Sequence, residues 1–206
     1  RLKRSPAALI AMGFIGFVVF LAIFGPYLTP HDPNLGNLMV RLKPPSATHW
    51  FGTDQLGRDV FSRVIAGTRI SLFIGVVAEL IALTIGVIMG TIAGFFGGWV
   101  DKLISRLIEI LSSFPFLLFA LAIMMVLGPG IINIFIAIGL LSWTNVARLI
   151  RGQVMRLKTS EYVMAARAAG ANELSIIFKH LIPNCMSTII VILTMDIPGA
   201  IMTETF

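Results

Sequence analysis

Residues 110–147 have the sequence ILSSFPFLLFALAIMMVLGPGIINIFIAIGLLSWTNVA, which contains no charged side chain. As one straight helix this run would be about 57 Å long, nearly twice the roughly 30 Å of hydrocarbon in a bilayer. The tripeptide Gly128-Pro129-Gly130 interrupts the run near its middle, and both residue types break helices. The run therefore predicts two membrane crossings joined by a tight turn.

The composition of the whole chain agrees with a membrane protein. Its 206 residues are 57% hydrophobic and 13% charged, and the mean hydropathy is +0.92. A soluble domain has roughly 25% charged residues, which cover its surface. This composition excludes a soluble enzyme, a disordered linker and a coiled coil, and it predicts an all-α, polytopic bundle of membrane helices.

Three further apolar segments bring the predicted number of crossings to five. They are residues 7–28, 70–94 and 184–206. Basic residues precede the first segment, so a cleaved signal peptide is an alternative to a membrane anchor. We favour the anchor, because the run is longer than a signal core and no small-x-small cleavage site follows it.

Glycines recur at every fourth position in the second apolar segment. Gly86, Gly90 and Gly94 therefore share one face of a helix. A face without side chains predicts the close approach of another helix.

The distribution of basic residues predicts the orientation. Eleven of the 16 Lys and Arg residues lie in residues 1–4, 95–107 and 148–183, and five lie in residues 29–69. Because basic residues collect on the cytoplasmic side, the N-terminus and the 148–183 loop are predicted to be cytoplasmic. We divide the chain into residues 1–69, an N-terminal anchor with an external loop, and residues 70–206, a membrane core.

The 148–183 loop carries the pattern of two short helices. Ser160 or Thr159 is expected to cap the first helix, and Gly170 to end it in a left-handed conformation. The first helix has one unusually small face, which consists of Tyr162, Ala165, Ala166 and Ala169.

The second helix is expected to begin at Asn172 and to end before Pro183, because proline disrupts a helix interior. Its expected apolar stripe consists of Leu174, Ile177, Phe178 and Leu181. A flat alanine face suits close contact with another protein. An interfacial helix without a partner fits the pattern equally well.

Several motifs make the resemblance to a known family specific. The stretches EYVMAARAAG (161–170) and IIFKHLIPN (176–184) resemble the EAA loop of ABC-importer permeases. Ala165, Ala166, Gly170 and Pro183 stand at the family's spacing, whereas Met164 stands where the family has glutamate.

Three other stretches resemble the oligopeptide and dipeptide permease C branch of these permeases. They are WFGTDQLGRD (50–59), LIEILSSFPF (107–116) and SWTNVARLIRGQ (142–153). The resemblance implies a type I ABC-importer permease core, with a sixth helix beyond the five seen here. It also implies a location in the bacterial cytoplasmic (inner) membrane.

The resemblance further implies a set of partners. These are a homologous second permease subunit, two ATP-binding cassette subunits and an extracytoplasmic substrate-binding protein, in addition to membrane lipid. Because the sequence contains no Gly-Lys dipeptide, it has no P-loop, and ATP with its Mg²⁺ is expected on the partner ATPases. No nucleic-acid partner is expected, and no cofactor is expected on this chain.

Five residues are predicted to couple this chain to the ATPase subunits. Ala165, Ala166 and Gly170 would permit close approach, and Tyr162 and Arg167 would provide anchoring contacts. In the membrane, Asp196 is a candidate for the substrate path, where it could meet a peptide ammonium group. A hydrogen bond to a neighbouring helix is the favoured alternative.

The sequence predicts no catalytic site and no metal site. His31, His49 and His180 lie far apart in the chain, and an HExxH motif is absent. The single cysteine, Cys185, excludes an internal disulfide and a cysteine cluster. On the external side, Asp54, Arg58 and Asp59 could either contact a binding protein or hold the loop together.

The predicted function is therefore ATP-driven import of di- or oligopeptides, through a subunit that is not itself an enzyme. The same machinery could carry nickel, glutathione or antimicrobial peptides. A proton-coupled secondary transporter is the alternative from another class, because Glu79 and Asp196 are acids within apolar segments. No convincing internal repeat supports that alternative.

Overall fold

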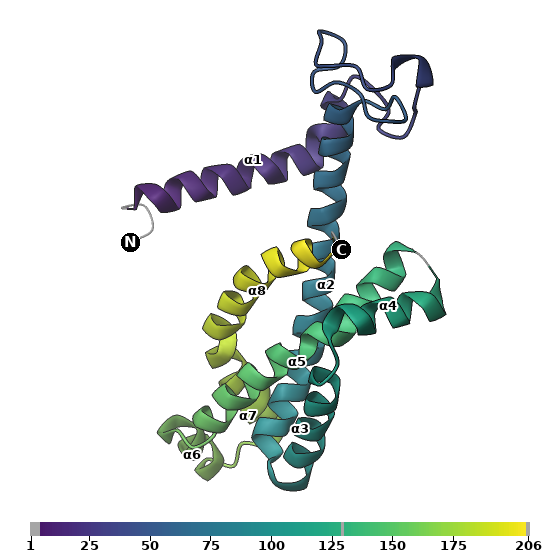
Figure 1. The fold of residues 1–206 in the computed structure, drawn as a ribbon. Coiled ribbons are helices and arrows are strands. Elements are labelled where there is room, and N and C mark those ends of the chain that lie inside the picture. Colours follow the sequence, from purple (N-terminus) through teal and green to yellow (C-terminus); the bar gives the residue numbers. More distant parts are fainter. Residues whose placement is uncertain (1–4, 129, 205–206) are drawn as a thin grey trace. The chain divides into compact units, whose positions relative to one another are not determined.

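A computed structural model describes residues 5–128 and 130–204 of the chain. Within these residues the regular structure is helical, apart from one isolated bridge between Thr53 and Asp59. The elements follow in the order of Figure 1: α1 (Pro6–Leu28), η2 (Leu38–Val40), α2 (Val60–Phe96), α3 (Gly98–Ser112), α4 (Phe116–Leu127), α5 (Ile131–Leu157), α6 (Glu161–Ala168), α7 (Glu173–Ile176), η3 (Ile177–Leu181) and α8 (Ile182–Glu204). The prediction of an all-α protein is confirmed.

The chain divides into two compact units, residues 1–73 and 74–206, and α2 belongs to both. In the first unit, α1 starts at Pro6, whose fixed φ suits the first turn of a helix. The Ser5 side chain accepts a hydrogen bond from the Ala8 amide and so caps this helix.

Three helices in the described part of the chain are long and apolar enough to cross a membrane. They span Pro6–Leu28, Val60–Phe96 and Glu173–Met202. They correspond to the first, second and fifth predicted crossings. The chain is thus a polytopic helical membrane protein.

The third predicted crossing has different bounds in the structure. It is divided between α3 and α4, with a break at residues 113–115. Pro115 explains the break, because it has no N–H for the helix ladder and its ring would clash with a preceding carbonyl. α4 has 12 residues, so it is about 18 Å long and shorter than a bilayer. The prediction of one continuous helix here was wrong.

The predicted turn between the next two helices is present. α4 ends at Leu127, Gly128 has a φ of +85°, and α5 begins at Ile131, while Pro129 lies outside the described residues. The Asn133 side-chain amide donates to the carbonyls of Leu127 and Gly128 at 2.9 and 2.8 Å. These bonds satisfy carbonyls that the end of α4 leaves open.

The glycine face of α2 packs against α5, as the sequence predicts. A Cβ atom added at Gly90 would lie 2.5 Å from the carbonyl oxygen of Ala147, and one at Gly94 would lie 2.8 Å from that of Arg151. Gly86 is equally close to Val146. Successive glycines meet successive turns of α5, so the two helices run in the same direction with their backbones in close contact.

Candidate functional site

The surface segment, defined here as residues 158–183, begins later than the sequence predicts. α5 continues to Leu157, so the first ten residues of the predicted 148–183 loop are helical. Lys158 follows this helix, and its ammonium group donates to the carbonyl of Gly94 at 2.8 Å. A cation near the carbonyls that end α2 satisfies those groups and interacts favourably with the helix dipole.

The first helix of the surface segment, α6, ends as predicted but is not capped as predicted. Gly170 has a φ of +83°, the Ala171 amide donates to Ala166 and the Gly170 amide donates to Arg167. These two bonds form a Schellman motif, which favours glycine at this position. Ser160 precedes the helix, but its hydroxyl donates to the Leu157 carbonyl instead of capping α6.

The second predicted helix begins as expected but does not end at Pro183. The Asn172 side chain accepts from the Ser175 amide at 2.7 Å and so caps α7. A π turn over Ile177–Leu181 then connects α7 to α8. Pro183 follows the π turn directly, and the widened turn allows the helix to continue through a residue that lacks an N–H. The prediction that Pro183 ends the helix was wrong.

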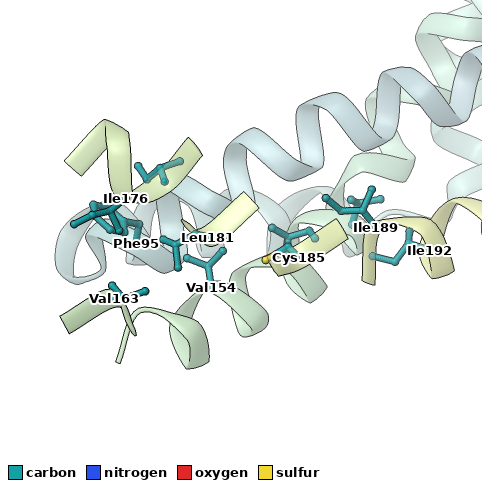
Figure 2. Close-up of a cluster of buried hydrophobic side chains, with 11 residues drawn as sticks. Phe95, Val154, Val163, Ile176, Leu181, Cys185, Ile189 and Ile192 are labelled. Carbon is teal, nitrogen blue, oxygen red and sulfur yellow. The ribbon is translucent and has the colours of Figure 1, made fainter. Parts of the chain in front are cut away.

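A buried cluster attaches one side of the surface segment to the membrane helices. Figure 2 shows these side chains, which come from α2, α5, α6, α7, η3 and α8. Val163, Val154 and Leu181 are fully buried in it. The cluster consists of Phe95, Val146, Ile150, Val154, Val163, Ile176, Ile177, Leu181, Cys185, Ile189 and Ile192.

The predicted apolar stripe is divided between the inside and the outside. Ile177 and Leu181 are buried, whereas Leu174 and Phe178 are each 65% exposed. The π turn contributes to this difference, because it changes the angle between successive side chains from that of an α-helix. The expectation of one continuous stripe was therefore wrong.

The five residues predicted to couple to a partner lie on α6 or directly after it, and most of them are exposed. Tyr162, Ala165, Arg167 and Gly170 are exposed, and Ala166 is half-buried. The Arg167 guanidinium lies 5.6 Å from the centre of the Phe95 ring, and the Tyr162 ring lies 6.3 Å from that of His180. Arg167 and Tyr162 thus already have neighbours in their own chain.

Sequence reasoning missed Val163 and Phe95 as anchors of the surface segment. Val163 is the only β-branched residue of α6, and its neighbours at 165 and 166 are alanines. A single large aliphatic side chain opposite a small face is a signal that could have identified it. Phe95 gives no comparable signal, because its role depends on where α2 ends.

An ion pair joins α3 to α5 close to the surface segment. Asp101 accepts two hydrogen bonds from Arg151, one from Nε and one from Nη2, the latter at 2.6 Å. The hydrogen bond to Arg151 lowers the pKa of Asp101, and it outweighs partial burial, which acts in the opposite direction. The same pairing raises the pKa of Arg151.

Two acidic side chains from different helices line one cavity in the second unit. The cavity has a volume of about 250 Å³, and both Glu79 of α2 and Asp196 of α8 line it. Glu79 is 2% exposed, and its Oε1 atom has no hydrogen-bond partner among the described residues. Ser142 and Asn145 of α5 add polar groups to the wall.

In the first unit, the acidic residues of the 29–59 loop make contacts within the unit. Asp54 accepts from the amides of Leu56 and Arg58 and from Arg58 Nε, and Arg63 Nη1 lies 3.3 Å from its Oδ2. The bond from the Arg58 amide is the main reason that the pKa of Asp54 lies below its ordinary value. These contacts favour the interpretation that Asp54 and Arg58 hold the loop together.

The fold defines a polytopic helical membrane protein whose surface segment is anchored by a buried cluster. Residues 82–206 match the family of binding-protein-dependent transport system inner membrane components. Residues 1–45 match the N-terminal TM domain of oligopeptide transport permease C. The chain therefore belongs to the family of binding-protein-dependent transport inner membrane permeases.

Curated relatives match almost the whole chain. It is 45% identical to the dipeptide transport system permease protein DppC of Bacillus subtilis and 44% identical to the oligopeptide transport system permease protein OppC of the same organism, over 206 residues each. It is 44% identical over 204 residues to the glutathione transport system permease protein GsiD of Salmonella typhimurium. The chain spans about two thirds of these relatives, namely 64%, 68% and 67% of their lengths.

Proposed function

We propose that this chain is the transmembrane permease subunit of an ATP-driven importer, and that separate ATPase subunits dock on the surface segment. One observation carries the proposal. Val163 and Leu181 are buried in the cluster and fix one side of the surface segment, whereas Ala165 and Gly170 of the same segment are exposed. A segment with one fixed side and one bare side can transmit a push from a partner to the membrane helices.

Within this proposal the five predicted residues have two kinds of role. Ala165, Ala166 and Gly170 allow a partner's backbone to approach closely, because they present little or no side chain. Arg167 and Tyr162 first hold α6 in place, through Phe95 and His180, and meet the partner with their exposed parts. Met164, which is 54% exposed, offers an adaptable apolar contact on the same short helix.

The proposed substrates are di- or oligopeptides. The printed names of two relatives concern dipeptide and oligopeptide transport, and the name of a third concerns glutathione, which is itself a small peptide. A peptide carries an ammonium group at neutral pH, and a carboxylate at membrane depth needs a partner of this kind. We therefore assign the cavity that Glu79 and Asp196 line to the substrate path.

The proposed assembly contains four kinds of component. A homologous second permease, two ATP-binding cassette subunits and an extracytoplasmic binding protein accompany this chain in the cytoplasmic membrane. Its N-terminus and the surface segment face the cytoplasm, in agreement with the excess of basic residues on that side. The five crossings, with residues 110–112 of α3 and the whole of α4 forming the third, belong to this proposal.

The test is coupling of ATP hydrolysis to uptake in proteoliposomes that contain the whole transporter. Gly170→Leu places a bulky side chain on the proposed docking surface and strains a residue with φ of +83°. We expect it to insert and assemble but to lose peptide uptake. Gly170→Asn separates the effect of side-chain bulk from the effect of backbone strain, because asparagine tolerates this φ and its side chain is smaller than that of leucine.

Gly152→Leu is the matched control for this experiment. Gly152 is an exposed residue of α5, and no described atom lies within 4 Å of a Cβ built on it, apart from its own helix backbone and chain neighbours. It should retain uptake and ATP-dependence. Normal coupling in Gly170→Leu, or uptake that follows a proton gradient without ATP, would refute the proposal.

A further inference from the structure

Two histidines that are distant in the sequence meet one aspartate in the first unit. His31 follows α1, His49 lies in the 29–59 loop, and Asp59 directly precedes α2. His49 Nδ1 lies 2.9 Å from Asp59 Oδ1, and His31 Nδ1 lies 4.0 Å from the same oxygen. One ligand atom from each of the three residues falls within 4.8 Å of the others. Residues that are distant in the sequence therefore lie together here.

The carboxylate of this cluster is fixed in a defined orientation. Asp59 is 2% exposed, and its Oδ2 atom accepts hydrogen bonds from the amide and the hydroxyl of Ser62, both at 2.8 Å. Because Ser62 occupies Oδ2, the other oxygen is left facing the two imidazole rings. A second residue that orients a carboxylate in this way is typical of protein metal sites.

The histidine side of the cluster has an unused ligand atom. His31 Nδ1 is buried and makes no hydrogen bond to any residue in 5–128 or 130–204. The two imidazole rings are stacked, with centres 4.7 Å apart and planes 29° apart. A buried nitrogen without a partner is costly, and an ion bound between the rings and Asp59 would supply one.

We propose that His31, His49 and Asp59 form a binding site for a divalent first-row transition ion such as Zn²⁺. Two imidazole nitrogens and one carboxylate oxygen are common zinc ligands, and tetrahedral coordination at about 2.0 Å places them about 3.3 Å apart. The two His–Asp separations of 2.9 and 4.0 Å lie on either side of this value, and all three ligand atoms lie within 4.8 Å of one another, so side-chain movements of up to about 1.5 Å suffice. His31 also lines a cavity of about 350 Å³, from which water can occupy the fourth position.

The ion would join three segments of a unit that has few buried apolar residues. In the described connection between α1 and α2, the short 3-10 helix η2 is the only helical element. Few side chains of this connection are buried, and Thr53 and Asp59 are among them. A metal bound to residues 31, 49 and 59 closes this long connection at both of its ends. Such a site stabilises the loop without any requirement for transport activity.

The test is zinc binding by the purified full chain in lipid nanodiscs, after removal of metal with a chelator. Calorimetric titration with ZnCl₂ should show one saturable site. Co²⁺ should give the intense visible absorption of tetrahedral coordination. His31→Gln should weaken binding by at least about tenfold, because it removes a ligand, and Ser62→Ala by about tenfold, because it loosens Asp59.

His180→Gln provides the matched control, because His180 belongs to the surface segment and not to this cluster. It should bind zinc as the unchanged chain does. His31→Gln is the safest variant for folding, since His31 Nδ1 makes no hydrogen bond in the described part of the chain. Absence of saturable binding in the unchanged chain, or equal affinities in the His31 and His180 variants, would overturn the inference. Neither result would affect the proposed transport function.

Discussion

The surface segment and the 29–59 loop are both built of short elements, but different forces hold them in place. The surface segment is anchored by buried aliphatic side chains, among them Val163 and Leu181. The 29–59 loop is held mainly by hydrogen bonds, in which Thr53, Asp54 and Asp59 take part. The comparison teaches that packing of apolar side chains holds the surface segment, whereas hydrogen bonds at a few points hold the 29–59 loop.

The largest expected effect on stability tests whether the buried cluster anchors the surface segment. Leu181→Ala removes a fully buried side chain from the cluster, and it should lower the free energy of unfolding by about 2–5 kcal/mol. Leu174→Ala is the matched control, because Leu174 is 65% exposed and should change this free energy by less than about 0.5 kcal/mol. Denaturant titration in detergent measures both. Equal effects of the two variants would show that the segment is not anchored by packing.

A smaller effect on stability is expected from the ion pair between Asp101 and Arg151, which joins α3 to α5. Asp101→Asn removes the charge that pairs with Arg151 and should lower the free energy of unfolding by about 1–3 kcal/mol. Glu109→Gln is the control, because its pair with Arg106 is largely exposed and is expected to contribute about 0–1 kcal/mol. Thermal unfolding at neutral pH measures both, and similar losses would contradict the expectation.

The same ion pair predicts a dependence of stability on pH. Since the pKa of folded Asp101 lies below its ordinary value of 3.8, the stabilisation is fully present above that value. It is lost as the pH falls through the lower pKa of the folded state. Thermal unfolding between about pH 7 and about pH 3 should therefore show a steeper acid loss in the unchanged chain than in Asp101→Asn. Parallel curves would contradict the pairing.

The smallest effect is expected in the loop that hydrogen bonds hold together. The Thr53 hydroxyl donates to the Val40 carbonyl and accepts from the Lys43 amide, so Thr53→Val should cost about 1–2 kcal/mol locally. Amide hydrogen exchange should become faster in residues 38–43. Thr48→Val, at an exposed position, should leave that exchange unchanged. Unchanged exchange in both variants would show that something other than these bonds holds the loop.

Local patterns predicted much of this structure from the sequence. The spacing of Gly86, Gly90 and Gly94 predicted the close approach of a helix, and Gly170 and Asn172 predicted helix ends, because each depends on backbone geometry within a few residues. The motifs of the 161–184 region also identified the family, which the comparisons confirmed.

What could not be predicted depends on contacts between distant residues. Phe95 anchors α6 only because α2 ends beside it, and His31 meets His49 only because of the course of the loop. The π turn before Pro183 depends on how α7 continues into α8. The rule that proline ends a helix therefore gave the wrong result when it was applied to the 172–183 segment alone. The docking roles of Tyr162, Ala165, Ala166, Arg167 and Gly170, and the substrate role of Asp196, stay predictions.

The bare glycine face of α2 has a mechanical consequence. Because Gly90 and Gly94 lie directly against the carbonyls of Ala147 and Arg151, any side chain at either position would collide with α5. A larger residue at either glycine would therefore force the two helices apart along the face where their backbones now meet.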